Sequence, residues 1–194
     1  MKTNIAISLK LLLLLTIITG ALYPAMLTIL AQIVFPNKAN GSFVNINHRI
    51  VGSELIGQKF ENDYYFWGRP SVIDYQPLPS AGSNLSMTSL KMKELYENRK
   101  KLFMQKNNIP RDIEIPAEMM YSSASGIDPH ISVQAARLQM ERISLARHLE
   151  APDIRRLSQL IVQFTEKRQL GILGEPRVDV LRLNIELDKT FHKD

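Results

Sequence analysis

The longest apolar stretch of the chain runs from Leu11 to Phe35, twenty-five residues without a charged side chain. A helix rises about 1.5 Å per residue, so this stretch would be about 37 Å long, more than the about 30 Å hydrocarbon core of a bilayer. A buried helix of a soluble protein is usually shorter and keeps a polar stripe. The pattern therefore predicts a transmembrane helix at about residues 11–35, within an N-terminal segment 1–35.

A cleaved signal peptide is the alternative interpretation, because Lys2 and Lys10 precede the apolar run. The run continues for ten residues past Ala25, however, and no A-x-A cleavage site stands there. We therefore expect an uncleaved signal-anchor. The positive charges of the N-terminal tail exceed those of the opposite flank, which offers Lys38 and then Arg49. Positive charge favours the cytoplasmic side, which predicts a cytoplasmic N-terminus and an exported domain.

Within this helix, Pro24 follows Gly20 by four residues. Proline removes one backbone hydrogen bond and crowds the preceding turn, so we expect a kink. In a membrane the freed carbonyl needs a partner from a neighbouring helix or from water. Gly20, Tyr23 and Pro24 are therefore the predicted docking positions for partner proteins.

After the membrane helix, the pattern predicts a short linker and then β-structure. The linker, residues 35–42, contains Pro36, which ends a helix. β-Branched runs broken by Asn and Gly predict one or two strands at 43–57. The aromatic residues 64–67 predict a core strand, and the Pro/Ser/Gly-rich residues 73–84 predict a long exposed loop.

Helical periodicity follows in three places. Residues 89–107 carry an apolar stripe of period 3.6 on a basic surface, which could meet headgroups, phosphates or an acidic partner, or be only solvated. Residues 133–149 predict a helix with Ser132 as its N-cap. Another helix is predicted from Pro152 to a stop near Gly171.

Residues 177–188 alternate between apolar and polar, but Val178 and Val180 are out of phase with the apolar residues from Leu181 onward. A strand with a β-bulge near Val180–Leu181 would reconcile the two phases. The sum is an α+β fold, with one N-terminal transmembrane helix followed by a single mixed α/β soluble domain at residues 36–194.

Composition narrows the function classes. The net charge of +5 falls to about +3 without Lys2 and Lys10, too little to indicate nucleic-acid binding. The chain has no cysteine, so neither disulfides nor thiolate metal sites are expected. Its four histidines have no acidic or His partner at helical ligand spacing, and no metal is predicted. These histidines are His48, His130, His148 and His192.

The stretch "SASGIDPHIS" at 123–132 offers three kinds of chemistry. Ser125, Asp128 and His130 could form a hydrolase triad, but neighbours in one loop rarely converge, and no G-x-S-x-G elbow exists. A phosphate cradle lacks the G-x-x-x-x-G-K-[ST] motif. The amides at the start of the following helix could still hold an anion, with Gln134 or Gln139 bonding a base or phosphate. The third interpretation is a polar turn that leads into a helix.

One further motif is "DKTF" at Asp188–Phe191, which resembles the phosphorylated DKTG of P-type ATPases. Phe191 replaces the glycine, and the chain is too short for separate nucleotide and phosphorylation domains. We interpret the match as chance. The residues thus predict a membrane-anchored α+β domain without a catalytic set, which is typical of an accessory subunit.

Six blocks in a fixed order add a resemblance: "GSELIGQKF" (52–60), "YFWGRPS" (65–71), "SAGSNL" (80–85), "SASGIDPHIS" (123–132), "QAARLQMERISLAR" (134–147) and "GEPRVDVLRLNIELD" (174–188). They follow one hydrophobic helix that contains "TGALYP". In this order the blocks resemble the C subunits of the Kdp potassium-transporting ATPases over nearly the whole chain. Two positions depart from the family pattern, Asp179 where Asn is usual and Ala81 where a second Gly is usual.

The resemblance implies a non-catalytic, single-pass subunit of a bacterial inner-membrane complex for high-affinity K+ uptake. The implied partners are a channel-like K+-binding subunit, a P-type ATPase subunit and a small helical peptide. The subunit would stabilise the assembly and act as a chaperone-like factor that raises the ATP affinity of the ATPase subunit.

ATP, shared with the ATPase subunit, is the one cofactor that the resemblance implies. The nucleotide role would fall on a short turn and on one glutamine of the following helix, namely Ser123, Ser125 and Gly126 with Gln134 or Gln139. A periplasmic domain would lie away from cytoplasmic ATP, and we give the topology more weight in placing the domain.

Overall fold

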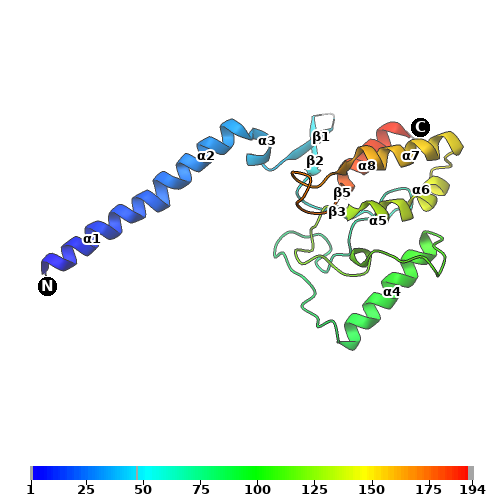
Figure 1. The fold of residues 1–194 in the computed structure, drawn as a ribbon, viewed down its shortest axis with the longest axis horizontal. Helices are drawn as coiled ribbons and strands as arrows, with labels where there is room; N and C mark the ends of the chain where they lie inside the picture. The colour runs from blue at the N-terminus through cyan, green and yellow to red at the C-terminus, as the bar shows by residue number, and fades with distance from the viewer. Residues whose placement is uncertain (1, 47, 192–194) are drawn as a thin grey trace. The chain divides into compact units, whose positions relative to one another are not determined.

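The computed structural model describes residues 2–46 and 48–191, and Figure 1 shows their helices and strands. The chain divides into two compact units, Met1–Val51 and Gly52–Asp194. The predicted division at residue 35, between membrane helix and soluble domain, stays a prediction about the protein in its membrane. The mixture of helices with small sheets confirms the predicted α+β class.

In the first unit, α1 (Lys2–Ile17), a π-helical turn η1 (Ile18–Leu22) and α2 (Tyr23–Val34) are continuous. Their stretch Thr3–Val34, 32 residues, is long and apolar enough to cross a membrane. The helix therefore begins earlier than the predicted residue 11. Charge limits which residues enter the bilayer, but it does not prevent the polar residues before them from being helical.

The π-turn η1 ends at Leu22, two residues before Pro24. Proline has no N–H to offer the carbonyl four residues earlier, and here the N–H of Tyr23 donates to the carbonyl of Ile18, five residues back. The helix thus has a widened turn next to Pro24, and the predicted kink stays a prediction. The Thr28 hydroxyl donates to the Pro24 carbonyl at 2.8 Å, so the Thr28 hydroxyl has its hydrogen-bond partner within the helix.

A one-turn helix, α3 (Pro36–Ala39), lies within the predicted linker and starts with Pro36, a residue suited to the first helical turn. The strands β1 (Phe43–Ile46) and β2 (Arg49–Ser53) then pair in a two-stranded sheet, which confirms the strands expected at 43–57.

In the second unit, α4 (Leu90–Lys106) begins after Ser89, whose hydroxyl accepts from the Met92 N–H as an N-cap. A 3-10 turn, η2 (Ala117–Met119), follows α4 in the chain. The helix predicted at 133–149 starts after the N-cap Ser132, as expected. It is divided, however, into α5 (Val133–Leu138) and α6 (Met140–Ala146), with Gln139 between them.

The remaining elements are α7 (Ala151–Gln163), β4 (Thr165–Glu166), β5 (Arg177–Asp179) and α8 (Val180–Thr190). The expected helix stop at Gly171 is wrong, because α7 ends at Gln163 and the chain enters β4. In the three-stranded antiparallel sheet β5 is central, pairing with β3 (His130–Ser132) and with β4.

The bulged strand predicted at 177–188 is also wrong. The apolar phase changes there because the chain switches from strand to helix at Asp179, whose carboxylate caps α8 by accepting from the Arg182 N–H at 2.8 Å. Val180, Leu183 and Leu187 then form one buried helical face.

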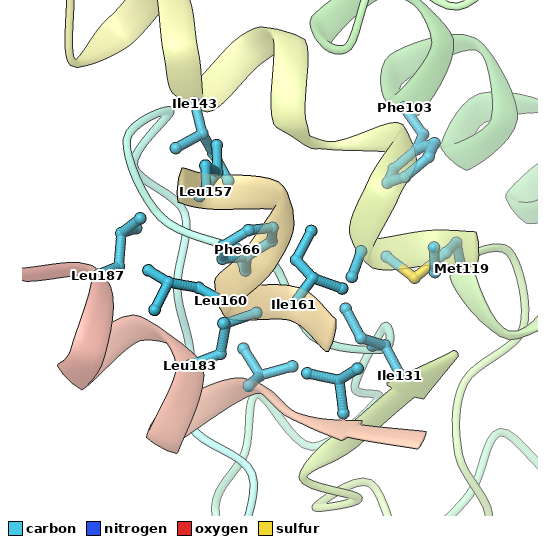
Figure 2. Packing of buried hydrophobic residues seen from close by; sticks show 14 of the residues in the cluster. Phe66, Phe103, Met119, Ile131, Ile143, Leu157, Leu160, Ile161, Leu183 and Leu187 are labelled. Atoms are coloured by element: carbon cyan, nitrogen blue, oxygen red, sulfur yellow. The ribbon is translucent and has the colours of Figure 1, made fainter. Parts of the chain in front are cut away.

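The main core lies where α5, α7 and α8 pack together and against the sheet (Figure 2). Ile143, Leu157, Ile161 and Leu183 are fully buried there. Phe66, which comes from an irregular segment, lies among them with no exposed surface.

Candidate functional site

The aromatic residues 64–67, predicted to form a strand, lie in an irregular segment, Asn62–Trp67. We call it the aromatic segment. Its prediction as a strand is wrong, although the expected burial of an aromatic side chain is met by Phe66. Buried backbone groups need partners, and here side chains from distant helices supply them.

Asn184 of α8 binds the backbone of Phe66 at both polar groups. Its Oδ1 accepts from the Phe66 N–H at 2.8 Å, and its Nδ2 donates to the Phe66 carbonyl at 2.9 Å. Gln139 repeats this arrangement at Trp67, accepting from its N–H at 2.7 Å and donating to its carbonyl at 3.2 Å. Both carboxamide residues are almost completely buried.

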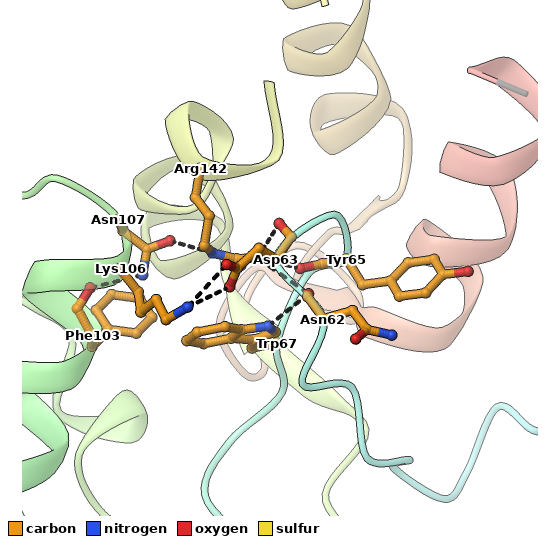
Figure 3. Close-up of polar contacts among 8 residues, drawn as sticks. All are labelled: Asn62, Asp63, Tyr65, Trp67, Phe103, Lys106, Asn107 and Arg142. Carbon is orange, nitrogen blue, oxygen red and sulfur yellow. Dashed lines mark hydrogen bonds and ion pairs between the residues drawn. The ribbon is translucent and has the colours of Figure 1, made fainter. Parts of the chain in front are cut away.

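Arg142 of α6 binds further carbonyls of the aromatic segment (Figure 3). Its Nη1 donates to the carbonyls of Asp63 and Tyr65, and its Nε donates to Asn107 Oδ1 at 2.9 Å. The guanidinium carbon also lies 4.0 Å from the Trp67 ring centroid. Among the described residues no carboxylate lies within ion-pair distance of Arg142, and burial lowers its pKa to about 10.

The edge of the aromatic segment is held by a clamp between α6 and α8. Arg147 donates to the Tyr64 carbonyl at 2.8 Å and pairs with Asp188 at 2.5 Å. The Tyr65 hydroxyl donates to the same carboxylate at 2.8 Å, and burial, together with Asp188, raises the Tyr65 pKa to about 12. Asp188, the aspartate of "DKTF", therefore serves this contact.

Arg69 follows the aromatic segment and pairs with Asp128 of the "SASGIDPHIS" stretch at 2.7 Å. The same carboxylate accepts from the His130 N–H at 3.0 Å. Burial alone would raise the Asp128 pKa, but the hydrogen bonds from His130 and from Arg69 outweigh it and lower the pKa to about 2. Asp128 is therefore ionised at neutral pH and acts as an acceptor.

Glycines allow the chain segments to approach each other in this region. Gly126 has φ of +73°, and a Cβ there would lie 2.6 Å from Ile73 Cγ1. A Cβ on Gly57 would lie 2.6 Å from the Asp128 carbonyl oxygen, beside the hydrogen bond from the Gly57 N–H to the Ile127 carbonyl. The blocks around residues 57, 81 and 126, distant in sequence, thus pack together.

The predicted nucleotide-site residues lie in three different environments. Ser123 and Ser125 line a cavity of about 500 Å³ together with Arg69 and Asp128. Gln134 is exposed, and its Nε2 donates to the Glu114 carbonyl at 3.1 Å. Gln139 is fully buried against Trp67, with both ends of its carboxamide bonded, so this conformation presents none of its polar atoms to a ligand.

The structure does not arrange Ser125, Asp128 and His130 as a catalytic triad. Ser125 Oγ accepts from the Ile127 N–H at 3.3 Å, as in a local turn. Over residues 48–191 no hydrogen bond joins Ser125 to His130. No group of three or more His, Asp or Glu side chains among the described residues could hold a metal, and His192 lies outside them.

Gly20 and Pro24 lie in and just after the π-turn, with Tyr23 between them. All three side-chain positions are exposed, and a Cβ on Gly20 would have no neighbour within 4 Å. Their predicted docking role stays a prediction.

Reasoning from the sequence missed Arg142, Asn184 and Arg69. Arg142 follows Gln139 by three residues, and Asn184 falls on the apolar face of α8. A polar residue at a core position is the sequence signal for a buried network. This signal was hidden for Asn184, because the pattern of residues 177–188 predicts a strand rather than a helix.

A helix long and apolar enough to cross a membrane, followed by an α+β domain, is the arrangement of a membrane-anchored protein. The family model for KdpC, described as the c chain of the K+-transporting ATPase, matches residues 5–189. The chain belongs to this family, and the resemblance is confirmed.

Curated relatives agree over nearly their full lengths. A potassium-transporting ATPase KdpC subunit of Leptospira interrogans is 43% identical over 187 residues, covering 96% of this chain and 94% of its own. One from Polynucleobacter asymbioticus is 43% identical over 191 residues, covering 97% and 99%. One from Caldanaerobacter subterraneus is 40% identical over 193 residues, covering 100% and 98%.

Proposed function

We propose that this chain is a non-catalytic accessory subunit that stabilises a K+-transporting ATPase complex in the bacterial inner membrane. Its partners would be a channel-like K+-binding subunit, a P-type ATPase subunit and a small helical peptide. The helix would dock on the channel-like subunit, and the domain would cover the outer entrance of that subunit. Membership of the KdpC family is the observation that carries this proposal.

The helix supports the docking part of the proposal. Its side chains from Thr3 to Val34 are exposed almost throughout. The helix has a π-turn near Pro24 and no side chain at Gly20. Together they give its surface a feature against which another helix can pack. The domain supports a structural role, since its buried polar groups bind backbone rather than face a reaction site.

Removal of residues 1–35 tests the docking. We expect the truncated protein, exported behind a cleavable signal, to fail to co-purify with the other subunits and to abolish K+ uptake at micromolar K+. Intact assembly and uptake would contradict the proposal. A fusion after residue 194 of a reporter active only in the periplasm tests the orientation, and activity of a cytoplasm-only reporter would reverse it.

A second candidate function is a chaperone-like effect on ATP binding by the ATPase subunit. The cavity of about 500 Å³ beside Ser123 and Ser125 favours it, because Arg69 lines that cavity and could meet a phosphate. Crosslinking of 8-azido-ATP to the full chain would support direct contact if Ser125→Ala and Gly126→Val reduce it. If the chain is crosslinked only within the complex, and the two variants leave the crosslinking unchanged, direct contact between ATP and this cavity would be contradicted.

A further inference from the structure

A second cavity, of about 450 Å³, lies between α4 and side chains of residues 59–75, and Arg69 lines both this cavity and the one beside Ser123. We call the second cavity the α4 cavity. Its volume lies within the range of small-ligand sites, about 300–1,000 Å³. Six of its lining residues carry the argument: Phe60, Trp67, Arg99, Leu102, Phe103 and Met119.

The wall of the α4 cavity is mainly apolar. Phe103 and Met119 are buried, whereas Leu102 is 53% exposed at the rim. Trp67 has the Arg142 guanidinium 4.0 Å from its ring centroid, and Figure 3 shows the indole beside Phe103 and Lys106. Such a wall accommodates an aromatic or branched apolar group, and it holds the indole in one orientation.

Most of the charged groups around the cavity are already neutralised by neighbours. Lys59 lies 3.0 Å from Glu61 and 2.8 Å from Asp74. Lys106 pairs with Asp63 at 2.9 Å, and Arg69 pairs with Asp128 at 2.7 Å. These pairs leave no excess of positive charge on their side of the cavity.

Arg99 is the exception. Its Nη1 donates to the Met120 carbonyl at 2.8 Å, and over residues 2–46 and 48–191 no carboxylate lies within ion-pair distance of it. Burial lowers the pKa of this guanidinium, because desolvation disfavours its charged form. An arginine has five N–H donors, so donors remain for a bidentate contact with a planar anion.

We propose that the α4 cavity binds a monocarboxylate, whose anionic group pairs with Arg99 and whose aromatic or branched apolar body lies against Trp67 and Phe103. The charge count selects against polyphosphates. A single uncompensated guanidinium matches one negative charge, whereas a triphosphate would bring several unpaired charges beside Glu61 and Asp74.

Such a carboxylate can come from a free organic acid or from an acidic residue beside an aromatic one in a peptide. The chain contains a single tryptophan, Trp67, so its intrinsic fluorescence reports directly on this cavity. We would reconstitute the full chain in phosphatidylcholine nanodiscs and titrate it with 3-phenylpropionate and with acetyl-Phe-Glu-amide. Saturable fluorescence changes are expected, and the probe that saturates at the lower concentration identifies the source.

Three matched probes separate the contributions. 3-Phenylpropanamide lacks the charge, propionate lacks the ring, and ATP carries several charges. Each is expected to bind at least about tenfold more weakly than the better carboxylate probe. Equal binding of 3-phenylpropanamide would overturn the role of Arg99, and stronger binding of ATP would overturn the charge argument.

Variants locate the site. Arg99→Gln is expected to weaken binding by about tenfold or more, while Arg99→Lys keeps the charge and recovers part of the loss. Leu102→Glu places a negative charge at the exposed rim and is expected to weaken binding without disturbing the fold. Arg111→Gln, an exposed cation outside this cavity, serves as the control.

Binding that survives both Arg99→Gln and Leu102→Glu would place the ligand elsewhere and overturn the proposal. The absence of a saturable signal with either carboxylate probe would do the same. These measurements use the isolated chain, so their failure leaves the proposed role in the complex untouched, and failure of complex assembly leaves them valid.

Discussion

The carboxamide of Gln139 binds both the N–H and the carbonyl of Trp67, as a neighbouring strand would do. Asn184 does the same for Phe66, the preceding residue. The aromatic segment therefore keeps its buried backbone satisfied without belonging to a sheet. Its conformation depends on side chains rather than on a ladder of backbone hydrogen bonds.

Gln139→Ala should reveal this dependence. It leaves the polar groups of Trp67 without partners and removes an acceptor of Arg142, so we expect a loss of about 2–4 kcal/mol in the free energy of unfolding. Urea unfolding followed by Trp67 fluorescence measures it. Gln134→Ala, at an exposed glutamine with one hydrogen bond, should change stability by less than about 1 kcal/mol. Equal losses would contradict the assignment.

Asp128→Asn should give a pH-dependent loss. The folded-state pKa of Asp128 is about 2, below the ordinary value of 3.8, so ionisation favours the folded state. The contribution, about 2 kcal/mol, is present above pH 3.8 and is lost as pH falls toward 2. The variant should therefore be less stable than the parent at pH 7, and the difference should shrink at acidic pH. A constant difference would indicate a packing effect instead.

Asp179→Asn should act in the opposite direction. Burial raises the pKa of this N-cap, so its ionised form weakens the folded state above the folded pKa. Asparagine keeps a capping oxygen for the Arg182 N–H without the buried charge. We expect the variant to be more stable than the parent at pH 7, with the gain vanishing as pH approaches 3.8. Urea titrations at several pH values test the sign.

Gly126→Ala and Gly171→Ala form a matched pair. The two glycines have φ of +73° and +79°, so alanine is strained at both, by about 1 kcal/mol. Only Gly126 has close neighbours, with Ile73 Cγ1 2.6 Å from the position of a Cβ. Its substitution should therefore cost about 2 kcal/mol more in thermal or urea unfolding. Similar losses would show that loop packing around residue 126 is loose.

Gly20→Leu tests the membrane surface. A side chain there meets nothing within 4 Å inside the chain, so helix content should remain unchanged by circular dichroism in nanodiscs. If the position packs against a partner helix, a leucine should reduce co-purification of the complex severalfold. Ile5→Leu, at another exposed position of the same helix, is the control. If Gly20→Leu leaves assembly of the complex unchanged, the contact with the partner helix lies on another face of the membrane helix.

The sequence carried strong local signals for some elements. The predicted cap Ser132 and the periodicity from residue 89 mark helix starts that the structure confirms, and the uncharged run ending at Phe35 marks the helix of membrane-spanning length. These features depend on neighbours in the chain, and periodicity detects them.

The failures arise where distant residues decide the conformation. The aromatic segment has the composition of a strand, but its backbone partners come from Gln139, Arg142 and Asn184. The break at Gln139 likewise coincides with side-chain bonds to Trp67, 72 positions away, that no local pattern reveals. The switch at Asp179 is different, because its cap is a local bond to the Arg182 N–H that the alternation of residues 177–188 concealed. The candidate residues Ser123 and Ser125 do line a cavity, whereas the α4 cavity draws its walls from separate segments that the pattern does not connect.

The bond between Asn184 and Phe66 spans 118 positions of the chain. During synthesis the aromatic segment emerges long before its partner, so until then its backbone is bonded to water and its phenylalanine is exposed. The domain can therefore complete its core only once residue 184 has been made and, in a periplasmic domain, translocated. Until then, the segment is open to proteases and to holding chaperones, which makes biogenesis sensitive to how quickly the C-terminal helix follows.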